Sequence, residues 1–217
     1  MSQLFGPRAN TIGRIVLASI LVLPVAALAL HVLLMNSPYV TGQTNTPEQP
    51  VPFSHKHHVT EDGIDCRYCH FDVEKSAVAG VPPTQVCMSC HAHLWTNAAM
   101  LEPVRASYAT GVPLRWRQAN RLPGYVYFDH SIHIAKGIGC TTCHGPVGQM
   151  PLIYQARKLS MGWCISCHRD PGRFVRKPSQ IFAAEWSPDD DPAQIRRLLS
   201  QYLISTKHLT DCSTCHR

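Results

Sequence analysis

The chain has 217 residues, a formal net charge of +6, 10 cysteines, 17 prolines and 13 glycines. So many prolines and glycines interrupt most periodic patterns, and they argue against a fold built on a conventional apolar core. The hydrophobic content of 45% does not change this conclusion, because much of it lies in a single segment near the N-terminus.

That segment, residues 15–35, carries no charge and follows Arg8 and Arg14. As a helix it spans about 31 Å at 1.5 Å per residue, enough to cross a hydrocarbon core of about 30 Å. A cleaved signal peptide is the alternative, since Ala27 and Ala29 form a small-residue pattern, but the apolar run continues to Met35. We expect an uncleaved transmembrane helix with residues 1–14 in the cytoplasm, because the arginines precede the helix.

Every cysteine falls in one of five Cys-x-x-Cys-His motifs, numbered here in chain order: motif 1 (66–70), motif 2 (87–91), motif 3 (140–144), motif 4 (164–168) and motif 5 (212–216). This spacing is the attachment signature of c-type haem, in which the two thiols form thioethers to the haem and the histidine binds the iron. A zinc ribbon, a disulfide framework, a thioredoxin-like motif or an iron–sulfur cluster would leave the five histidines unexplained. We therefore expect five haem c groups.

The motifs assign two sets of site residues. Covalent haem attachment is predicted at Cys66, Cys69, Cys87, Cys90, Cys140, Cys143, Cys164, Cys167, Cys212 and Cys215. The predicted proximal iron ligands are His70, His91, His144, His168 and His216.

Haem faces replace much of a core, which predicts the fold class: a multihaem cytochrome c, mostly coil with short α-helices wrapped around five haems and little or no β structure. Haem c is attached outside the cytoplasm. We therefore expect a single-pass protein of the bacterial cytoplasmic membrane with its haem domain periplasmic or otherwise extracytoplasmic. Without Arg8 and Arg14 the exported part carries a formal charge of +4. Ten haem propionates add about −10 and five ferric centres about +5, so the charge of the exported part is about −1, which gives no support to nucleic-acid binding.

The pattern Phe-x-His-x-x-His occurs twice, at 53–58 and at 128–133. The following motifs repeat at similar offsets, from 66 to 140 and from 87 to 164, which predicts an internal duplication. A C-terminal helix is expected after Asp191, with Ile195, Leu198, Leu199, Tyr202 and Leu203 on one face. The predicted organisation is a cytoplasmic N-terminus (1–14), a transmembrane helix (15–35), a linker (36–52), two-haem module 1 (53–100), a connector (101–124), two-haem module 2 (125–175), and the C-terminal helix with the fifth haem (176–217).

Further histidines supply candidates for the second axial position on each iron. The predicted distal ligands are His55, His58, His130, His133 and His208, with Met150 or Met161 as the alternative on one haem. His57 and His93 have no counterpart in the repeat. A surplus of ligands favours six-coordinate haems, which transfer electrons and offer no vacant site for a substrate.

An apolar anchor, the stretch 37–43, two Phe-x-His-x-x-His units, five haem motifs and the stretch 140–164 together resemble the ActA family, the membrane-anchored pentahaem cytochrome c subunits of alternative complex III. The resemblance covers essentially the whole chain. It implies a non-catalytic electron-transfer subunit of a quinol oxidoreductase that passes electrons to a periplasmic acceptor. The implied partners are NrfD-like quinol-binding membrane subunits, an iron–sulfur subunit, and a monohaem cytochrome or soluble electron carrier.

Two other functions use the same kind of motif. A NapC/NrfH-type quinol dehydrogenase also has one anchor and several haems, but such proteins typically begin their haems sooner after the helix than here, where Cys66 comes 31 residues after Met35. A multihaem reductase such as a nitrite reductase needs an open haem position, often marked by lysine in place of the motif histidine. All five motifs here end in histidine, which argues against a reductase.

Overall fold

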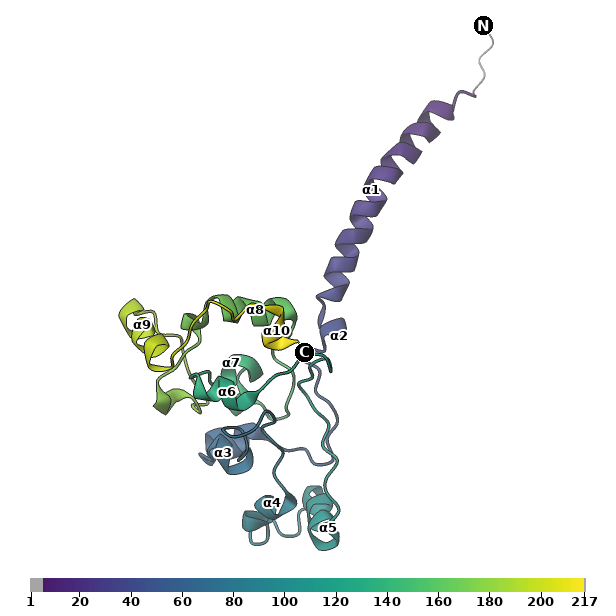
Figure 1. The fold of residues 1–217 in the computed structure, drawn as a ribbon. Helices are drawn as coiled ribbons and strands as arrows, with labels where there is room; N and C mark the ends of the chain where they lie inside the picture. Colours follow the sequence, from purple (N-terminus) through teal and green to yellow (C-terminus); the bar gives the residue numbers. More distant parts are fainter. Residues whose placement is uncertain (1–5, 217) are drawn as a thin grey trace. The chain divides into compact units, whose positions relative to one another are not determined.

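The computed structural model describes residues 6–216, in two compact units that divide between Gly42 and Gln43. The first unit contains α1 (Ala9–Met35) and the short α2 (Pro38–Thr41), which ends at Gly42 with a left-handed φ of 70° (Figure 1). Of the described residues, only α1 forms a helix that is long and apolar enough to cross a membrane, with a mean hydropathy of 2.6. A signal sequence shares these properties, so they are compatible with an anchor without specifying one.

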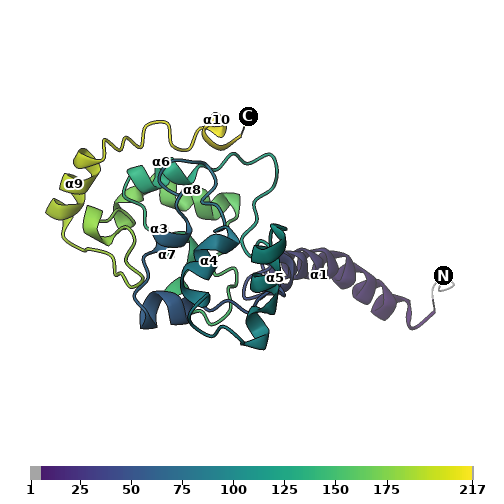
Figure 2. The same ribbon diagram turned by 90° about the horizontal axis from the view of Figure 1, so that it is seen from below.

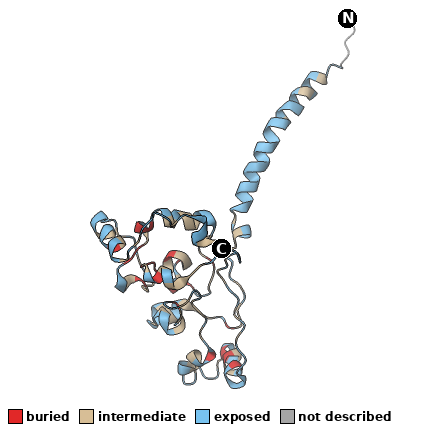
Figure 3. Ribbon diagram, viewed as in Figure 1, coloured by how far each residue is buried: buried red, intermediate tan, exposed pale blue. Residues whose placement is uncertain are grey.

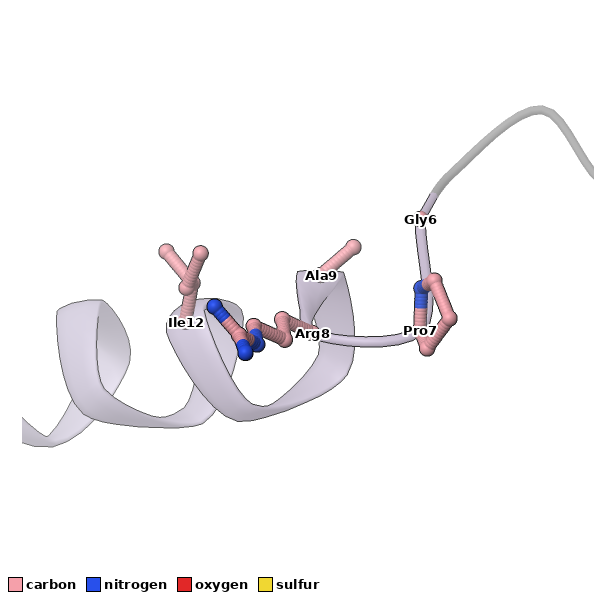
Figure 4. A pocket seen from close by; sticks show the side chains of 5 residues that line it. All are labelled: Gly6, Pro7, Arg8, Ala9 and Ile12. Carbon is pink, nitrogen blue, oxygen red and sulfur yellow. The ribbon is translucent and has the colours of Figure 1, made fainter.

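Helix α1 begins six residues before the predicted segment, because the prediction excluded the charged Arg14, whereas helix formation tolerates arginine well. Pro24 lies inside the helix. Figure 4 shows the first turn, where an open hollow is surrounded by Gly6, Pro7, Arg8, Ala9 and Ile12. A hollow on one exposed helix turn offers a ligand no enclosure.

The second unit consists of short helical pieces joined by long loops, and no strand occurs between residues 43 and 216. Its elements are the π-helix η1 (Lys56–Glu61), α3 (Cys66–Cys69), α4 (Thr84–His91), η2 (Ala99–Leu101), α5 (Glu102–Thr110), α6 (His130–Ala135), α7 (Cys140–His144), η3 (Val147–Gln149), α8 (Met161–Arg169), η4 (Pro171–Arg173), η5 (Pro178–Gln180), α9 (Pro192–Gln201) and α10 (Cys212–Cys215). Two isolated bridges, Gln43 with Gln155 and Ile138 with Val175, are the only β pairing described. The predicted coil-rich fold with short helices is confirmed.

The apolar core of this unit is divided into three small clusters, visible as scattered buried segments in Figure 3. Their buried members are Val51, Leu101 and Val104; Val73, Ile134 and Ile181; and Ile138, Val175 and Leu198. Many large apolar side chains remain exposed outside the anchor, among them Tyr68, Phe71, Leu94, Trp95, Tyr125, Tyr127, Ile132 and Met161. Haems attached at the motifs would offer apolar faces against which such side chains can pack.

The predicted C-terminal helix is confirmed as α9. Asp191 caps it by accepting a hydrogen bond from the Ala193 amide at 2.9 Å, and Leu198 is buried against the third cluster. Leu203, which the sequence places on the same apolar face, is 82% exposed. The helix ends at Gln201, and Leu203 adopts a positive φ of 51°, so the helical periodicity no longer applies to it. In both Figure 1 and Figure 2, α9 and α5 lie at opposite ends of the unit.

Candidate functional site

Each Cys-x-x-Cys-His motif occupies a short helix. Motifs 1, 3 and 5 form α3, α7 and α10, while motifs 2 and 4 form the later turns of α4 and α8. Positions i and i+3 of a helix share one face, so each pair of thiols points to the same side. All ten cysteines are free and at least partly exposed. The thiols of each motif are therefore placed for two bonds to one flat group, and none is engaged in a disulfide.

The motif histidines are held by one ring nitrogen. In four of them Nδ1 lies within hydrogen-bond distance of a backbone carbonyl, which accepts from Nδ1–H. These contacts join His70 to Gly80 O (2.8 Å), His91 to Leu94 O (3.1 Å), His168 to Leu209 O (2.7 Å) and His216 to Tyr125 O (3.1 Å). A proton on Nδ1 leaves the lone pair of Nε2 free, which is the tautomer that binds a metal. His144 differs, because its Nδ1 lies 3.0 Å from Nδ2 of Asn120.

The two Phe-x-His-x-x-His units fold alike. Phe53 meets His55 edge-on at 4.9 Å and stacks on His58 at 4.4 Å. Phe128 meets His130 edge-on at 4.8 Å and stacks on His133 at 4.4 Å. The second histidine of each unit is tied to the carbonyl four residues earlier, at 2.9 Å in the first and 2.7 Å in the second. The duplication thus repeats side-chain geometry as well as sequence.

Three upstream histidines face three motif histidines at nearly the same distance. The ring centroids are separated by 6.2 Å in His58–His91, 6.3 Å in His130–His144 and 6.2 Å in His133–His168. The interplanar angles, in contrast, range from 8° to 65°. A histidine–metal bond is about 2 Å long, so two rings on opposite sides of one metal have facing nitrogens about 4 Å apart and centroids about 6 Å apart. A shared axis fixes this separation and leaves the ring rotation free, so the residues present fit an iron between each pair.

His55 is the fourth upstream histidine, and its position differs. Its Nδ1 is buried without a hydrogen-bond partner. Burial, followed by the nearby His70, lowers the pKa of His55 to about 4. Burial also lowers the pKa of His144 to about 4, with smaller contributions from His130 and His70. Both rings are therefore neutral at physiological pH, and neutral imidazole is the form that binds a metal.

The attachment cysteines form a row. Electrostatic contacts link Cys87 to Cys69, Cys66 to Cys140, Cys143 to Cys164 and Cys167, and Cys164 to Cys215. The thiols of Cys66 and Cys140 hydrogen-bond to each other, which lowers the pKa of Cys66 to about 7 and raises that of Cys140. Burial raises the pKa of Cys143 to about 12. The order of motifs in space is thus 2, 1, 3, 4, 5, and Figure 1 shows α4, α3, α7, α8 and α10 following one another in this order.

The other predicted ligands do not pair in this way. His208 is 75% exposed and its Nδ1 lies 2.9 Å from an Asp211 carboxylate oxygen; within residues 6–216 its ring contacts no other aromatic ring. Met161 is 63% exposed at the start of α8, whereas Met150 is only 1% exposed and packs beside Gly145.

Two histidines without a counterpart in the repeat remain near the surface. His57 bonds to Glu61 at 2.9 Å, and its ring stacks on Trp95. Its neighbouring carboxylates, Glu61 first, raise the pKa of His57, which favours a protonated ring over a metal ligand. His93 is exposed in the turn that follows motif 2.

Sequence patterns gave no signal for Arg176, which is 1% exposed. Its Nη2 donates to the hydroxyls of Thr141 (2.7 Å) and Thr142 (2.9 Å), the two residues between the cysteines of motif 3. The guanidinium also lies 4.2 Å from the centre of the Trp186 ring. A Cβ added at Gly139 would lie 2.2 Å from Cζ of Arg176, so only glycine fits at this position. Burial lowers the pKa of Arg176 to about 10, and in the described chain no carboxylate neutralises it.

Two known proteins or families are similar to this chain in sequence. Residues 126–217 match the family model described as cytochrome c7 and related cytochrome c. The chain is also 28% identical, over 170 residues, to the multihaem cytochrome c subunit of menaquinone reductase from Nitratidesulfovibrio vulgaris (strain Hildenborough). That alignment covers 78% of this chain and 68% of the relative. The fold class is that of a multihaem cytochrome c, and the cofactor that it implies is c-type haem.

Proposed function

We propose that this multihaem cytochrome c carries five haems and is the electron-transfer subunit of a membrane quinol:acceptor oxidoreductase of the alternative complex III type. The observation that carries the proposal is the uniform 6.2–6.3 Å separation of three histidine pairs. Each pair combines one upstream histidine with one motif histidine, and equivalent members of the two modules play equivalent parts. Bound haem supplies one-electron chemistry, which the protein tunes through its ligands and surroundings.

The duplication assigns the axial ligands. From the three ring pairs, the proposed sets are His58 with His91, His130 with His144, and His133 with His168. The duplication makes His55 with His70 the counterpart of His130 with His144, and His70 lies near enough to affect the pKa of His55. The ten motif cysteines hold the haems covalently. His216 is left for motif 5, and its partner is His208 or Met161, both of which are exposed. Met150 is enclosed by protein atoms and serves as a packing residue.

The protein's part in electron transfer is to hold neutral imidazoles in fixed orientations and to place attachment sites side by side. The row of motifs has two ends, motif 2 on α4 and motif 5 on α10. We propose that electrons enter at one end and leave at the other. Two axial ligands on each iron leave no position for a substrate, so the chain acts as a relay and lacks a catalytic centre of its own.

Quinone chemistry belongs to partner subunits in this proposal. A single helix such as α1 provides no cavity for a quinone, and we assign it the role of membrane anchor with a cytoplasmic N-terminus. The expected partners are NrfD-like quinol-binding subunits, an iron–sulfur subunit, and a monohaem cytochrome or soluble carrier on the periplasmic side. The relative described as a menaquinone reductase subunit supports a place in a quinone-linked complex.

That relative also favours a second candidate, in which electrons flow from a periplasmic donor to menaquinone. The two directions use the same relay. They are distinguished by purifying the complex from membranes through a tag on this chain. If the complex oxidises quinol, added menaquinol reduces the haems. If it reduces menaquinone, a reduced periplasmic cytochrome reduces the haems, and menaquinone added afterwards reoxidises them.

The haem assignment is tested on the purified chain. Five haems per polypeptide are expected from the pyridine haemochrome spectrum, together with low-spin ferric signals in electron paramagnetic resonance. A high-spin signal in the fully loaded protein, or a count below five, contradicts the proposal. Reduction of the haems by quinol without any other subunit would instead indicate a NapC/NrfH-type quinol dehydrogenase.

A further inference from the structure

Asn120 lies in the connector between the two modules, where the sequence gave no functional signal. Its half-buried side chain reaches motif 3, and its Nδ2 lies 3.0 Å from Nδ1 of His144. Its other terminal atom, Oδ1, is buried and has no hydrogen-bond partner. A buried amide oxygen without a partner is costly, so its natural partner is missing from this arrangement.

The contact is unusual among the motif histidines. The other four present Nδ1 to a backbone carbonyl. A backbone carbonyl is the same whatever residue carries it, whereas a side-chain amide is specified by the sequence. Motif 3 is therefore the one place among the five motifs where a substitution can change the group that faces the proximal histidine.

The protonation state required for iron binding decides which amide atom faces the ring. When Nε2 of His144 binds iron, Nδ1 carries the proton and must donate. Nδ2 of Asn120 is itself only a donor, so it is the wrong partner for that state. Half a turn of the amide group exchanges its two atoms: Oδ1 becomes the acceptor at Nδ1, and Nδ2 takes the buried position that Oδ1 now occupies.

We propose that Asn120 is a positioning residue for His144: its Oδ1 accepts the Nδ1–H bond, fixes the ring, and sets the midpoint potential of the haem at motif 3. This inference rests on the proposed function, because it requires His144 to be an iron ligand. Hydrogen-bond partners of a metal-bound histidine fix its tautomer and control its basicity. A stronger acceptor makes the imidazole richer in electrons and stabilises the ferric state.

The test compares three substitutions in the haem-loaded full chain by spectroelectrochemical titration. Asn120→Asp places a carboxylate at Nδ1. At the wild-type midpoint of one haem, it is expected to raise the ratio of oxidised to reduced haem at least tenfold, a shift of about 59 mV to lower potential. Asn120→Leu removes the acceptor and is expected to shift the same haem about threefold in the opposite direction. Gln118→Asp adds the same charge on an exposed side chain two residues away and is expected to change the ratio less than twofold.

Haem counting and electron paramagnetic resonance separate this inference from the function on which it rests. A wild-type chain with fewer than five haems contradicts the proposed function. A fully loaded, low-spin Asn120→Asp chain whose potentials match those of Gln118→Asp overturns the role of Asn120 alone. If the aspartate variant does not accumulate, Asn120→Leu decides: a shift of one haem to higher potential supports the role, and unchanged potentials overturn it.

Discussion

Module 1 and module 2 present the same ligand geometry in different surroundings. In each module the phenylalanine meets the first histidine edge-on and stacks on the second. The ring-centroid distances of the two modules agree to within 0.1 Å. The first histidine, however, has no Nδ1 partner in module 1, while His130 in module 2 bonds to Ala77 O at 2.8 Å. Ala77 belongs to module 1, so a histidine of module 2 is held in place by the backbone of module 1.

The motif environments differ in the same direction. Arg67, within motif 1, forms an exposed ion pair with Asp65, whereas motif 3 is held by the buried Arg176. Cys90 of motif 2 is exposed, whereas burial raises the pKa of its counterpart in motif 4, Cys167, to about 11. The duplication therefore preserved the arrangement of the histidines proposed to bind iron and changed what surrounds them. Because burial and nearby charge set haem potentials, the two modules are expected to differ in potential although their ligands are the same.

The largest expected difference between the two modules is in how well the chain folds after one haem is removed. Replacing Cys140 and Cys143 by Ser removes a haem from the middle of the row, where burial raises the pKa of Cys143 to about 12. Cys140 and Cys87 each pack against a core cluster, so the position in the row is what separates the two variants. Because haem replaces apolar core here, we expect this variant not to accumulate as folded protein. Replacing Cys87 and Cys90 removes a haem from one end, and we expect a folded chain with four haems. Haem staining and urea unfolding measure both, and equal tolerance of the two changes would contradict the difference between the modules.

Removal of one distal ligand is expected to have the next largest effect. His133→Ala and His58→Ala should each convert one haem in five to a five-coordinate, high-spin form, visible in electron paramagnetic resonance. His133 faces motif 4, which lies inside the row, so His133→Ala should slow electron transfer between the two ends of the row by about tenfold or more. His58 faces motif 2 at one end of the row, so His58→Ala should affect only the entry or exit of electrons there. His93→Ala is the matched control, because His93 is exposed, and its spectrum should remain low-spin. A high-spin signal in that control would add His93 to the ligands.

The next prediction compares the buried Arg176 beside motif 3 with the exposed Arg67 of motif 1 by their contributions to the free energy of unfolding. Arg176→Met leaves the hydroxyls of Thr141 and Thr142 without their donor, and each buried unpaired group costs about 1–3 kcal/mol. We expect a loss of about 2–4 kcal/mol in the free energy of unfolding, together with a lower potential for the haem of motif 3, since a buried positive charge is removed. Arg67→Met breaks an exposed ion pair and should cost under about 1 kcal/mol. Equal losses in the two variants would show that the burial of Arg176 contributes nothing.

The limits of sequence reasoning follow the same division. The motifs predict the attachment cysteines, because covalent haem attachment needs a fixed spacing in the sequence. They also predict the coil-rich fold, because haem faces replace much of an apolar core. The Phe-x-His-x-x-His repeat likewise predicts which upstream histidines approach the motifs, since its local geometry is determined within six residues. Asn120 and Arg176 act across 24 and 34 or 35 residues, on His144 and on Thr141 and Thr142. No local pattern marks such contacts, and only the folded chain brings them together.

The smallest expected effect tests the shared part of the comparison. Phe53→Leu and Phe128→Leu each remove one stacked and one edge-on contact to the histidines of their module. Aromatic pairs contribute about 0.5–1.5 kcal/mol beyond the area that they bury, so each variant should lose about 1 kcal/mol in urea unfolding. The histidine contacts are the same in both modules, but Phe53 also meets Trp116 edge-on at 6.5 Å. Phe53→Leu should therefore lose up to about 0.5 kcal/mol more than Phe128→Leu, whereas the arginine pair should differ by more. A larger difference than this would mean that the modules differ in the rigidity of their histidines as well as in the charges around them.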